Sequence, residues 1–238
     1  MKITQERKIT MPFVLAKSDW RAIFPKAPDD VINAFAADAA SLDKAGITQT
    51  RTRLAYALAN VEHECGGFTI RNLTENINYT AKRMAAVWPG RFSSEDDVKK
   101  KYGTKPGWQK AAFDDIYGNR MGNRSGTNDG STYIGRGGPQ ITGRDGYREV
   151  GRRCGLDLVN KPELASDFSA QPAILAAFWS WKDLNSRADA GDFVGCVRKW
   201  NGGTVGLKDR EKQMDGNDPI IRRLTSMAAI MPRLDHIA

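Results

Sequence analysis

The feature that most constrains the fold of this 238-residue chain is a helical segment that two glycines bring to an end. Apolar residues recur at the spacing of one helix face, at Leu54, Leu58 and Val61. Thr50 or Thr52 can cap the start of the segment, because a threonine hydroxyl accepts a hydrogen bond from a first-turn N–H. Gly66 and Gly67 supply the left-handed conformations that terminate helices. The pattern predicts an amphipathic helix that stops just after residue 64.

Glu64 is placed at the C-terminal end of this predicted helix. A carboxylate there faces the negative end of the helix dipole, and burial against Phe68 would add a desolvation cost. Both effects would raise the pKa of Glu64 and keep a fraction of it protonated near neutrality, as a general acid requires. The alternative is a solvated glutamate in a frayed last turn, and this fragment alone leaves both interpretations open.

Composition limits the kind of fold and the kind of partner that this chain can have. With 40% apolar residues, the chain can bury one large core or two lobes of one, so we expect a single domain over residues 1–238. The 36 basic residues outnumber the 28 acidic ones and give a net charge of +8. This balance favours a polyanionic partner such as nucleic acid, anionic lipid or bacterial cell wall.

The first residues do not form a convincing export signal. A charged start is followed by a short apolar run over residues 9–16 that contains Pro12 and lacks a small-x-small cleavage site. No segment approaches the roughly 18 apolar residues of a membrane-spanning helix. We therefore expect residues 1–18 to be a loosely ordered N-terminal extension of a protein made in the cytoplasm without stable membrane insertion.

The cysteines and histidines predict neither a metal site nor a thiol nucleophile. The three cysteines are an odd number without Cys-x-x-Cys spacing: Cys65, Cys154 and Cys196. Cys65 adjoins His63, but neighbouring side chains on a helix diverge by about 100°, and the one other histidine is His236. Gly67 occupies the position where a His-Glu-x-x-His zinc motif needs its second histidine. We expect reduced thiols, no metal and no cofactor.

The rest of the chain is predicted to be mainly α-helical. Periodicity and capping residues predict helices over residues 31–42, 81–88, 94–102, 107–117, 145–154, 169–184, 193–200 and 218–231. The segment 169–184 is the most apolar and is expected to form core. A long irregular loop rich in Gly, Asn and Arg spans residues 118–138, where a loop of this length is often functional. Residues 133–141 could include a small β-hairpin.

Four short stretches, taken in order, resemble glycoside hydrolase family 19, the chitinase-like family that includes phage endolysins and bacterial cell-wall lysozymes. They are residues 63–68 (HECGGF), 73–79 (LTENINY), 133–145 (YIGRGGPQITGRD) and 200–203 (WNGG). The resemblance covers about residues 20–225 and is greater to the compact endolysin branch than to plant chitinases. It implies a lysozyme-like, two-lobed helical fold with a glycan-binding cleft, and hydrolysis with inversion at the anomeric carbon.

The resemblance also implies catalytic roles. Glu64 matches the general acid of the family. Inversion requires a second carboxylate about 6.5–9.5 Å away, with room for a water between it and the sugar, and Glu75 is the choice for this base. Glu75 could instead cap the next turn or pair with Arg71. Asp129 in the glycine-rich loop is the rival base, with a turn-forming role as its alternative.

Further residues are expected to hold the water and the sugar. Thr142 matches the hydroxyl residue that positions the attacking water. Sugar contacts are expected from Tyr79, Arg136, Gln140, Tyr147 and Asn201. Two departures from the family pattern occur: residues 138–141 read Gly-Pro-Gln-Ile where Pro-Ile-Gln-Leu is usual, and Gly146 replaces a common Asn. The glycines near Gln140 do not fit a dinucleotide loop, because no βαβ pattern flanks them.

The expected substrate is peptidoglycan. Its peptide carboxylates and anionic surroundings attract a protein of charge +8, whereas chitin is neutral. We therefore expect a monomeric muramidase-type endolysin that cuts β-1,4 bonds after its release to the wall. The alternatives are a chitinase, a non-catalytic wall-binding module without need of two acids, and a nucleic-acid binder. The Arg-rich helix predicted over residues 145–154 lacks the interleaved aromatic residues and the motifs of nucleic-acid binders.

Overall fold

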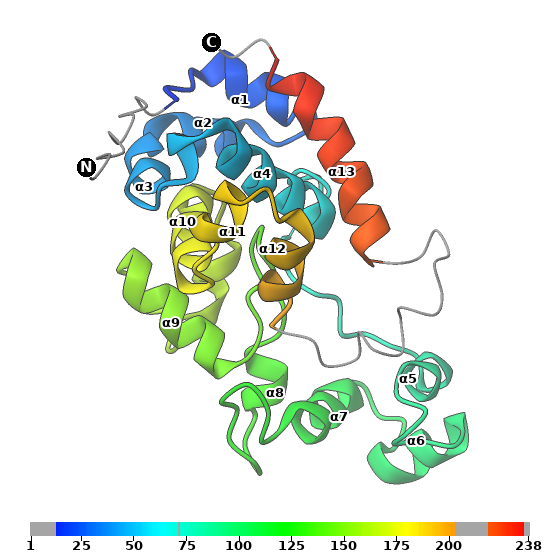
Figure 1. Cartoon of the computed structure of the whole chain (residues 1–238). Coiled ribbons are helices and arrows are strands. Elements are labelled where there is room, and N and C mark those ends of the chain that lie inside the picture. The colour runs from blue at the N-terminus through cyan, green and yellow to red at the C-terminus, as the bar shows by residue number, and fades with distance from the viewer. Residues whose placement is uncertain (1–12, 71, 203–218, 236–238) are drawn as a thin grey trace, which may run out of the picture.

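The computed structural model describes residues 13–70, 72–202 and 219–235, and these ranges fold mainly into helices (Figure 1). The α-helices are α1 (Lys17–Ile23), α2 (Asp29–Ala37), α3 (Ala39–Lys44), α4 (Arg51–Cys65), α5 (Ala81–Val87), α6 (Glu95–Tyr102), α7 (Trp108–Tyr117), α8 (Asp129–Thr132), α9 (Arg144–Cys154), α10 (Gln171–Trp181), α11 (Asn185–Asp189), α12 (Phe193–Trp200) and α13 (Pro219–Arg233). Short 3-10 turns span Ile47–Gln49, Pro162–Ser166 and Phe168–Ala170. The expected mainly helical fold is confirmed.

Helix α4 is the helix predicted from the glycine stop, and it lies at the centre of the larger lobe. The Thr50 hydroxyl caps its start by accepting a hydrogen bond from Arg53 N at 3.2 Å. Its apolar face is buried, with Leu54, Leu58 and Val61 almost inaccessible to solvent. Helices α11, α12 and α13 pack against it. Gly66 caps its end with φ +60°, so the sequence signals at both ends are confirmed.

Two separate apolar clusters divide the described residues into two lobes. The larger cluster joins α1–α4 with α9–α13, and it includes Trp20, Phe35 and Trp179. The smaller cluster joins α5, α6 and α7 with Ile134 of the glycine-rich loop. In Figure 1 the second group lies at the lower end, away from α1 and α13. This arrangement agrees with the two-lobed fold that the resemblance implied.

Residues 118–138 connect the lobes. Their backbone is fixed by single bridges rather than by strands: Thr74 and Ile141 each pair with Arg136. Gly137 has φ +76° and donates its N–H to the carbonyl of Leu73 at 2.8 Å. The part of the chain that the structure describes holds isolated bridges where the small β-hairpin was predicted, and α8 forms within the predicted loop.

Several boundaries differ from the sequence prediction for local reasons. The expected helix over residues 31–42 breaks at Asp38, whose carboxylate starts α3 by accepting from Ser41 N at 3.2 Å. Helices α1 and α11 were not predicted. Residues 13–18 belong to the fold rather than to a loose extension: Phe13 N donates to Thr48 O at 2.8 Å, and Leu15 is buried. Residues 1–12 lie outside the described ranges.

Candidate active site

A cleft of about 510 Å³ lies between the lobes, and Glu64 is on its wall. Three other predicted site residues line the same cleft: Gln140, Thr142 and Asn201. The larger lobe contributes residues from α4, α10 and α12, whereas Tyr117 and Met121 come from the end of α7 and the following loop. Residues from five parts of the sequence therefore meet in one groove.

The turn after α4 fixes the position of Glu64. Gly66 and Gly67 both adopt left-handed φ angles, and Phe68 also has a positive φ of 67°. The Phe68 ring packs at 5.2 Å from Phe24 and 5.5 Å from Phe35, which anchors the turn in the core. Phe68 was expected to desolvate Glu64, but it is absent from the cleft lining; Phe178, Trp181 and Trp200 are the large apolar side chains that share the cleft with this acid.

Glu75 lies beside Gly135, next to the cleft rather than among its lining residues. Its Oε2 accepts a hydrogen bond from Gly135 N at 3.2 Å, and its own N–H donates to Gly135 O at 2.8 Å. A methyl group placed on Gly135 would come 2.6 Å from Gln140 Oε1 and 3.4 Å from Glu75 Oε2. Both oxygens therefore border the space beside Gly135, and the lack of a side chain at this position leaves that space open. Gln140 also lines the cleft, so Glu75 lies near one of the residues of the groove that contains Glu64.

Tyr117 provides a second link between Glu75 and the cleft. Burial raises the pKa of Tyr117 to about 12, and the negative charge of Glu75 adds to the shift. Tyr117 lines the cleft with Glu64. An ionised Glu75 is thus close enough to act electrostatically on the wall of the cleft.

Gln140 and Thr142 are held in the geometry of a short turn. Gln140 has φ +57°, an unusual conformation for a residue with a side chain and one that often occurs at functional sites. Its Nε2 donates to Gly137 O at 3.1 Å, and the Thr142 hydroxyl donates to the Gln140 carbonyl at 3.2 Å. The Thr142 oxygen retains acceptor capacity toward the cleft, which suits the water-holding role that the resemblance implies.

Tyr147 and Arg136 were expected to contact the sugar, but neither is among the lining residues of the cleft. Tyr147 is fully buried, and its hydroxyl donates to Ile134 O at 2.6 Å. Arg136 donates from one guanidinium nitrogen to Tyr147 Oη and to Thr132 O, both at 2.7 Å. Both side chains support the loop behind the cleft. Because Tyr147 is fully buried, the direct sugar contact expected from it is wrong for this structure, and Arg136 makes its hydrogen bonds to Thr132 and Tyr147 inside the protein.

Tyr79 belongs to the smaller lobe. Its ring packs 5.7 Å from Trp88 and 5.9 Å from Phe113. It lines a separate hollow of about 270 Å³ with Trp108 and Gln109. Burial raises the pKa of Tyr79, and the charge of Glu75 contributes to the shift. The structure thus brings Tyr79 near Glu75 but not into the cleft that contains Glu64.

Asp129 is held inside a structural ion pair. It is 1% exposed, and its two oxygens accept from Arg124 Nε at 2.9 Å and from the second guanidinium nitrogen at 3.0 Å. The hydrogen bonds from Arg124 lower the pKa of Asp129. Arg144 lies 3.9 Å away. These contacts saturate the carboxylate that was the rival candidate for the general base.

Sequence reasoning missed several residues of the cleft: Tyr117, Asp145, Trp181, Lys182 and Trp200. Asp145 forms an ion pair with Arg148 at 2.7 Å. Trp181 and Trp200 end α10 and α12, and Trp181 was expected to be core because it belongs to the apolar segment 169–184. The Trp200 indole Nε1 is buried and has no hydrogen-bond partner among the described residues.

The cysteine that adjoins Glu64 is part of the core. The Cys65 thiol is buried and lies 3.2 Å from Val61 O, and burial raises its pKa to about 12. Such a thiol is unsuited to nucleophilic attack. Within the described ranges, no group of three metal-ligating side chains occurs. Arg71, Gly203 and His236, which entered the sequence analysis, lie outside these ranges.

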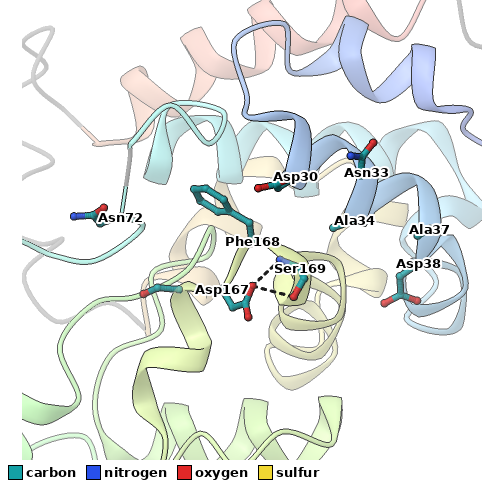
Figure 2. Close-up of a pocket in the computed structure, with 10 residues that line it drawn as sticks. Asp30, Asn33, Ala34, Ala37, Asp38, Asn72, Asp167, Phe168 and Ser169 are labelled. Atoms are coloured by element: carbon teal, nitrogen blue, oxygen red, sulfur yellow. Dashed lines mark hydrogen bonds between the residues drawn. The ribbon is translucent and has the colours of Figure 1, made fainter.

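A larger hollow of about 750 Å³ lies elsewhere, between α2 and the turns after α9 (Figure 2). Three acidic residues line it: Asp30 lies in the first turn of α2, and Asp38 and Asp167 serve as helix caps. Asp167 Oδ1 accepts from the backbone N and the hydroxyl of Ser169, each at 2.9 Å. Asp38 similarly holds Ser41. Because local structure uses these carboxylates, the smaller cleft with Glu64 is the better candidate for catalysis.

Comparisons with known proteins agree with this geometry. The sequence profile of a family described as "Chitinase class I" matches residues 29–205. A "Glycosyl hydrolase family 19 domain-containing protein" of Haemophilus influenzae is 31% identical over 205 residues, which are 85% of this chain and 94% of that protein. None of the described helices is long and apolar enough to cross a membrane.

Two solved structures share the fold. Chitinase C from Streptomyces griseus superposes with a TM-score of 0.53 at 18% identity, over 94% of this chain and 93% of its own. A chitinase C mutant gives a TM-score of 0.50 at 19% identity over the same shares. At these identities the likeness concerns the course of the backbone.

Proposed function

Because this chain belongs to glycoside hydrolase family 19, we propose that it is a glycosidase whose substrate is peptidoglycan, cut at β-1,4 bonds between amino sugars. The observation that carries the proposal is the position of Glu64 on an aromatic-lined cleft between two lobes. Gln140 and Thr142 are distant from Glu64 in the sequence but line the same groove. Glycosidic hydrolysis needs a proton donor and an activated water on opposite faces of the sugar.

Each residue has a defined role in this proposal. Glu64 protonates the oxygen of the leaving sugar. Glu75, ionised, takes a proton from water as the water attacks the anomeric carbon from the other side. Thr142 accepts or donates a hydrogen bond to that water, and Gln140 orients the sugar beside it. The outcome is inversion, because a single displacement turns the anomeric carbon over.

Charge supports peptidoglycan over neutral glycans. The chain carries a net charge of +8, and the ammonium group of Lys182 lies on the cleft wall. Peptidoglycan brings carboxylates into such a field, which raises its local concentration and its rate of association. We propose that the protein acts as a monomer on the cell wall, as an endolysin does after release from the cytoplasm. Chitin is the second candidate substrate, favoured by the description of the matching family.

The first prediction tests the reaction and the acid together. Purified sacculi should release soluble muropeptides, and mass spectrometry of their reducing ends should identify N-acetylmuramic acid or N-acetylglucosamine. Glu64→Gln should lower kcat by about 10²–10⁴-fold, the usual contribution of general acid catalysis. Glu163→Gln, an exposed glutamate on the turn Pro162–Ser166, is the matched control and should keep full activity. Chitin is tested in parallel. Release of soluble oligomers from chitin, with no muropeptides from sacculi, would reject peptidoglycan as the substrate.

A further inference from the structure

A second hollow continues the cleft at the side of α10–α12. It has a volume of about 590 Å³ and shares Trp181, Lys182 and Gly202 with the catalytic cleft. Helix α11 packs against α12, and α10 leads into both (Figure 1). A chain bound along the cleft could therefore extend a substituent into this hollow without leaving the protein surface.

Basic side chains dominate this hollow. Its lining includes four cationic side chains and one carboxylate. The cations are Lys182, Arg187, Arg198 and Lys199, and the carboxylate is Asp192. Arg187 forms an ion pair with Asp192 at 2.7 Å, and Lys199 pairs with the exposed Asp183 at 3.0 Å. Among the described residues that line the hollow, the basic side chains outnumber the acidic one. The excess gives the hollow a positive potential that is strongest where solvent is partly excluded.

Lys182 stands at the boundary between the two hollows. Its ammonium nitrogen lies 4.1 Å from the ring centre of Trp181 and 5.4 Å from that of Phe178. Burial lowers its pKa, which means that desolvation of the charge is incompletely compensated. Within the described residues no carboxylate forms an ion pair with it. An anion placed beside Lys182 would offset this desolvation.

The absence of a side chain at Gly195 shapes the floor of the hollow. A methyl group there would lie 2.5 Å from a guanidinium nitrogen of Arg187. The Gly195 N–H also donates to Asp192 Oδ1 at 2.7 Å, which caps α12. The ion pair between Arg187 and Asp192 therefore occupies the space that a side chain at Gly195 would fill. Arg198 and Lys199, one turn further along α12, also line the hollow.

We propose that this basic hollow binds carboxylate groups carried by the glycan, and so selects acidic, substituted strands over neutral ones. The inference rests on the proposed function, because it assumes a glycan in the adjoining cleft. Peptidoglycan offers carboxylates from two sources, the lactyl ether of its muramic acid and the peptide attached to it. Either source extends sideways from the strand, as the side hollow requires.

The test is a set of binding measurements in a Glu64→Gln background, in which bound glycan is not consumed. Three tetrasaccharides serve as probes: a neutral chitin tetramer, a peptidoglycan tetramer stripped of peptide, and the same tetramer with its peptides. The variants are Lys199→Gln, Arg198→Gln and the pair combined. Lys44→Gln, an exposed lysine on α3, is the matched control for loss of one positive charge. Thermal melting checks that each variant folds.

We expect each single variant to weaken binding of the peptide-bearing tetramer about two- to fivefold and the double variant about tenfold, with the neutral tetramer changed less than twofold. Equal weakening on the stripped tetramer identifies the lactyl carboxylate; weakening only with peptide identifies the peptide. Equal loss on the neutral probe, or no loss on any, overturns the inference. Muropeptide release from sacculi by the wild type is scored separately, so failure of the proposed substrate and failure of this hollow are distinguishable.

Discussion

At the scale of single residues, the candidate acids differ in what surrounds them. Glu64 and Asp145 line the cleft, Glu75 is joined to it through Gly135, and Asp129 is enclosed by Arg124. The sequence predicted Glu64 from its place before two glycines. It could not separate Glu75 from Asp129, because the distinction depends on an ion pair and on a glycine 60 residues away. The contact between Glu75 and Gly135 spans 60 residues and leaves no mark in local spacing, whereas Arg124 and Asp129 are close in sequence but pair only through the conformation of the folded loop.

Substitution should separate these carboxylates by their effects. Glu75→Gln should lower kcat by about 10²–10⁴-fold at unchanged stability, because it removes the proposed base. Asp145→Asn, which lies in the same cleft but is paired with Arg148, should lower kcat less than tenfold. Steady-state kinetics on solubilised peptidoglycan measure both. Comparable losses for the two variants, or a larger one for Asp145→Asn, would reassign the base.

Asp129→Asn should instead lower stability by about 1.5–3 kcal/mol, the usual worth of hydrogen bonds to a charged group. The pKa of Asp129 is lower in the folded state than in an unfolded chain. Its contribution is therefore complete above the unfolded value, near 3.9, and is lost as pH falls through the folded value. Urea unfolding at pH 7 should show the full difference from wild type, and at acid pH a smaller one. A difference that does not shrink would disprove this origin.

At the scale of elements, local signals predicted helices well where caps and apolar periodicity agree. Thr80 and Ser94 start α5 and α6 as expected, by accepting from Arg83 N and Asp97 N. The break at Asp38 was missed, although an Asp three residues before a Ser N–H is a capping pattern. Trp181 was expected to be core, but it lines the cleft. Periodicity identifies the apolar face of a helix and cannot show that a cleft opens beside that face.

The turn after α4 is the element on which the site depends most. Gly67 has φ +61°, and a methyl group there would clash with the Glu62 carboxylate. Gly67→Ala should lower the free energy of unfolding by about 1–2 kcal/mol, the cost of a left-handed residue with a side chain. Gly90→Ala is the matched control, because a methyl group on Gly90 would have no neighbouring atom within 4 Å and the φ angle of Gly90 is not in the left-handed region. It should change stability by less than about 0.5 kcal/mol; equal effects in denaturant titrations would mean that the turn is unstrained.

At the scale of the whole molecule, catalysis and charge act together. Two apolar clusters define two lobes. The cleft between the lobes and the basic hollow beside α10–α12 share Trp181, Lys182 and Gly202, so they adjoin each other. The two-lobed helical fold was predictable from the order of four motifs. The basic hollow was not, because its cations come from the residue after α10 and from α11 and α12, and they become neighbours only after folding.

The last prediction concerns salt. Added ions screen charges over about 10 Å at 0.1 M and about 3 Å at 1 M, so they weaken attraction between a protein of charge +8 and an acidic polymer. Between about 50 and about 500 mM NaCl, KM for peptidoglycan should rise about three- to tenfold. KM for a neutral chitin tetramer should change less than about twofold, since that ligand has no charge to screen. Initial rates on both substrates measure the contrast, and a parallel rise would show that charge does not govern the choice of substrate.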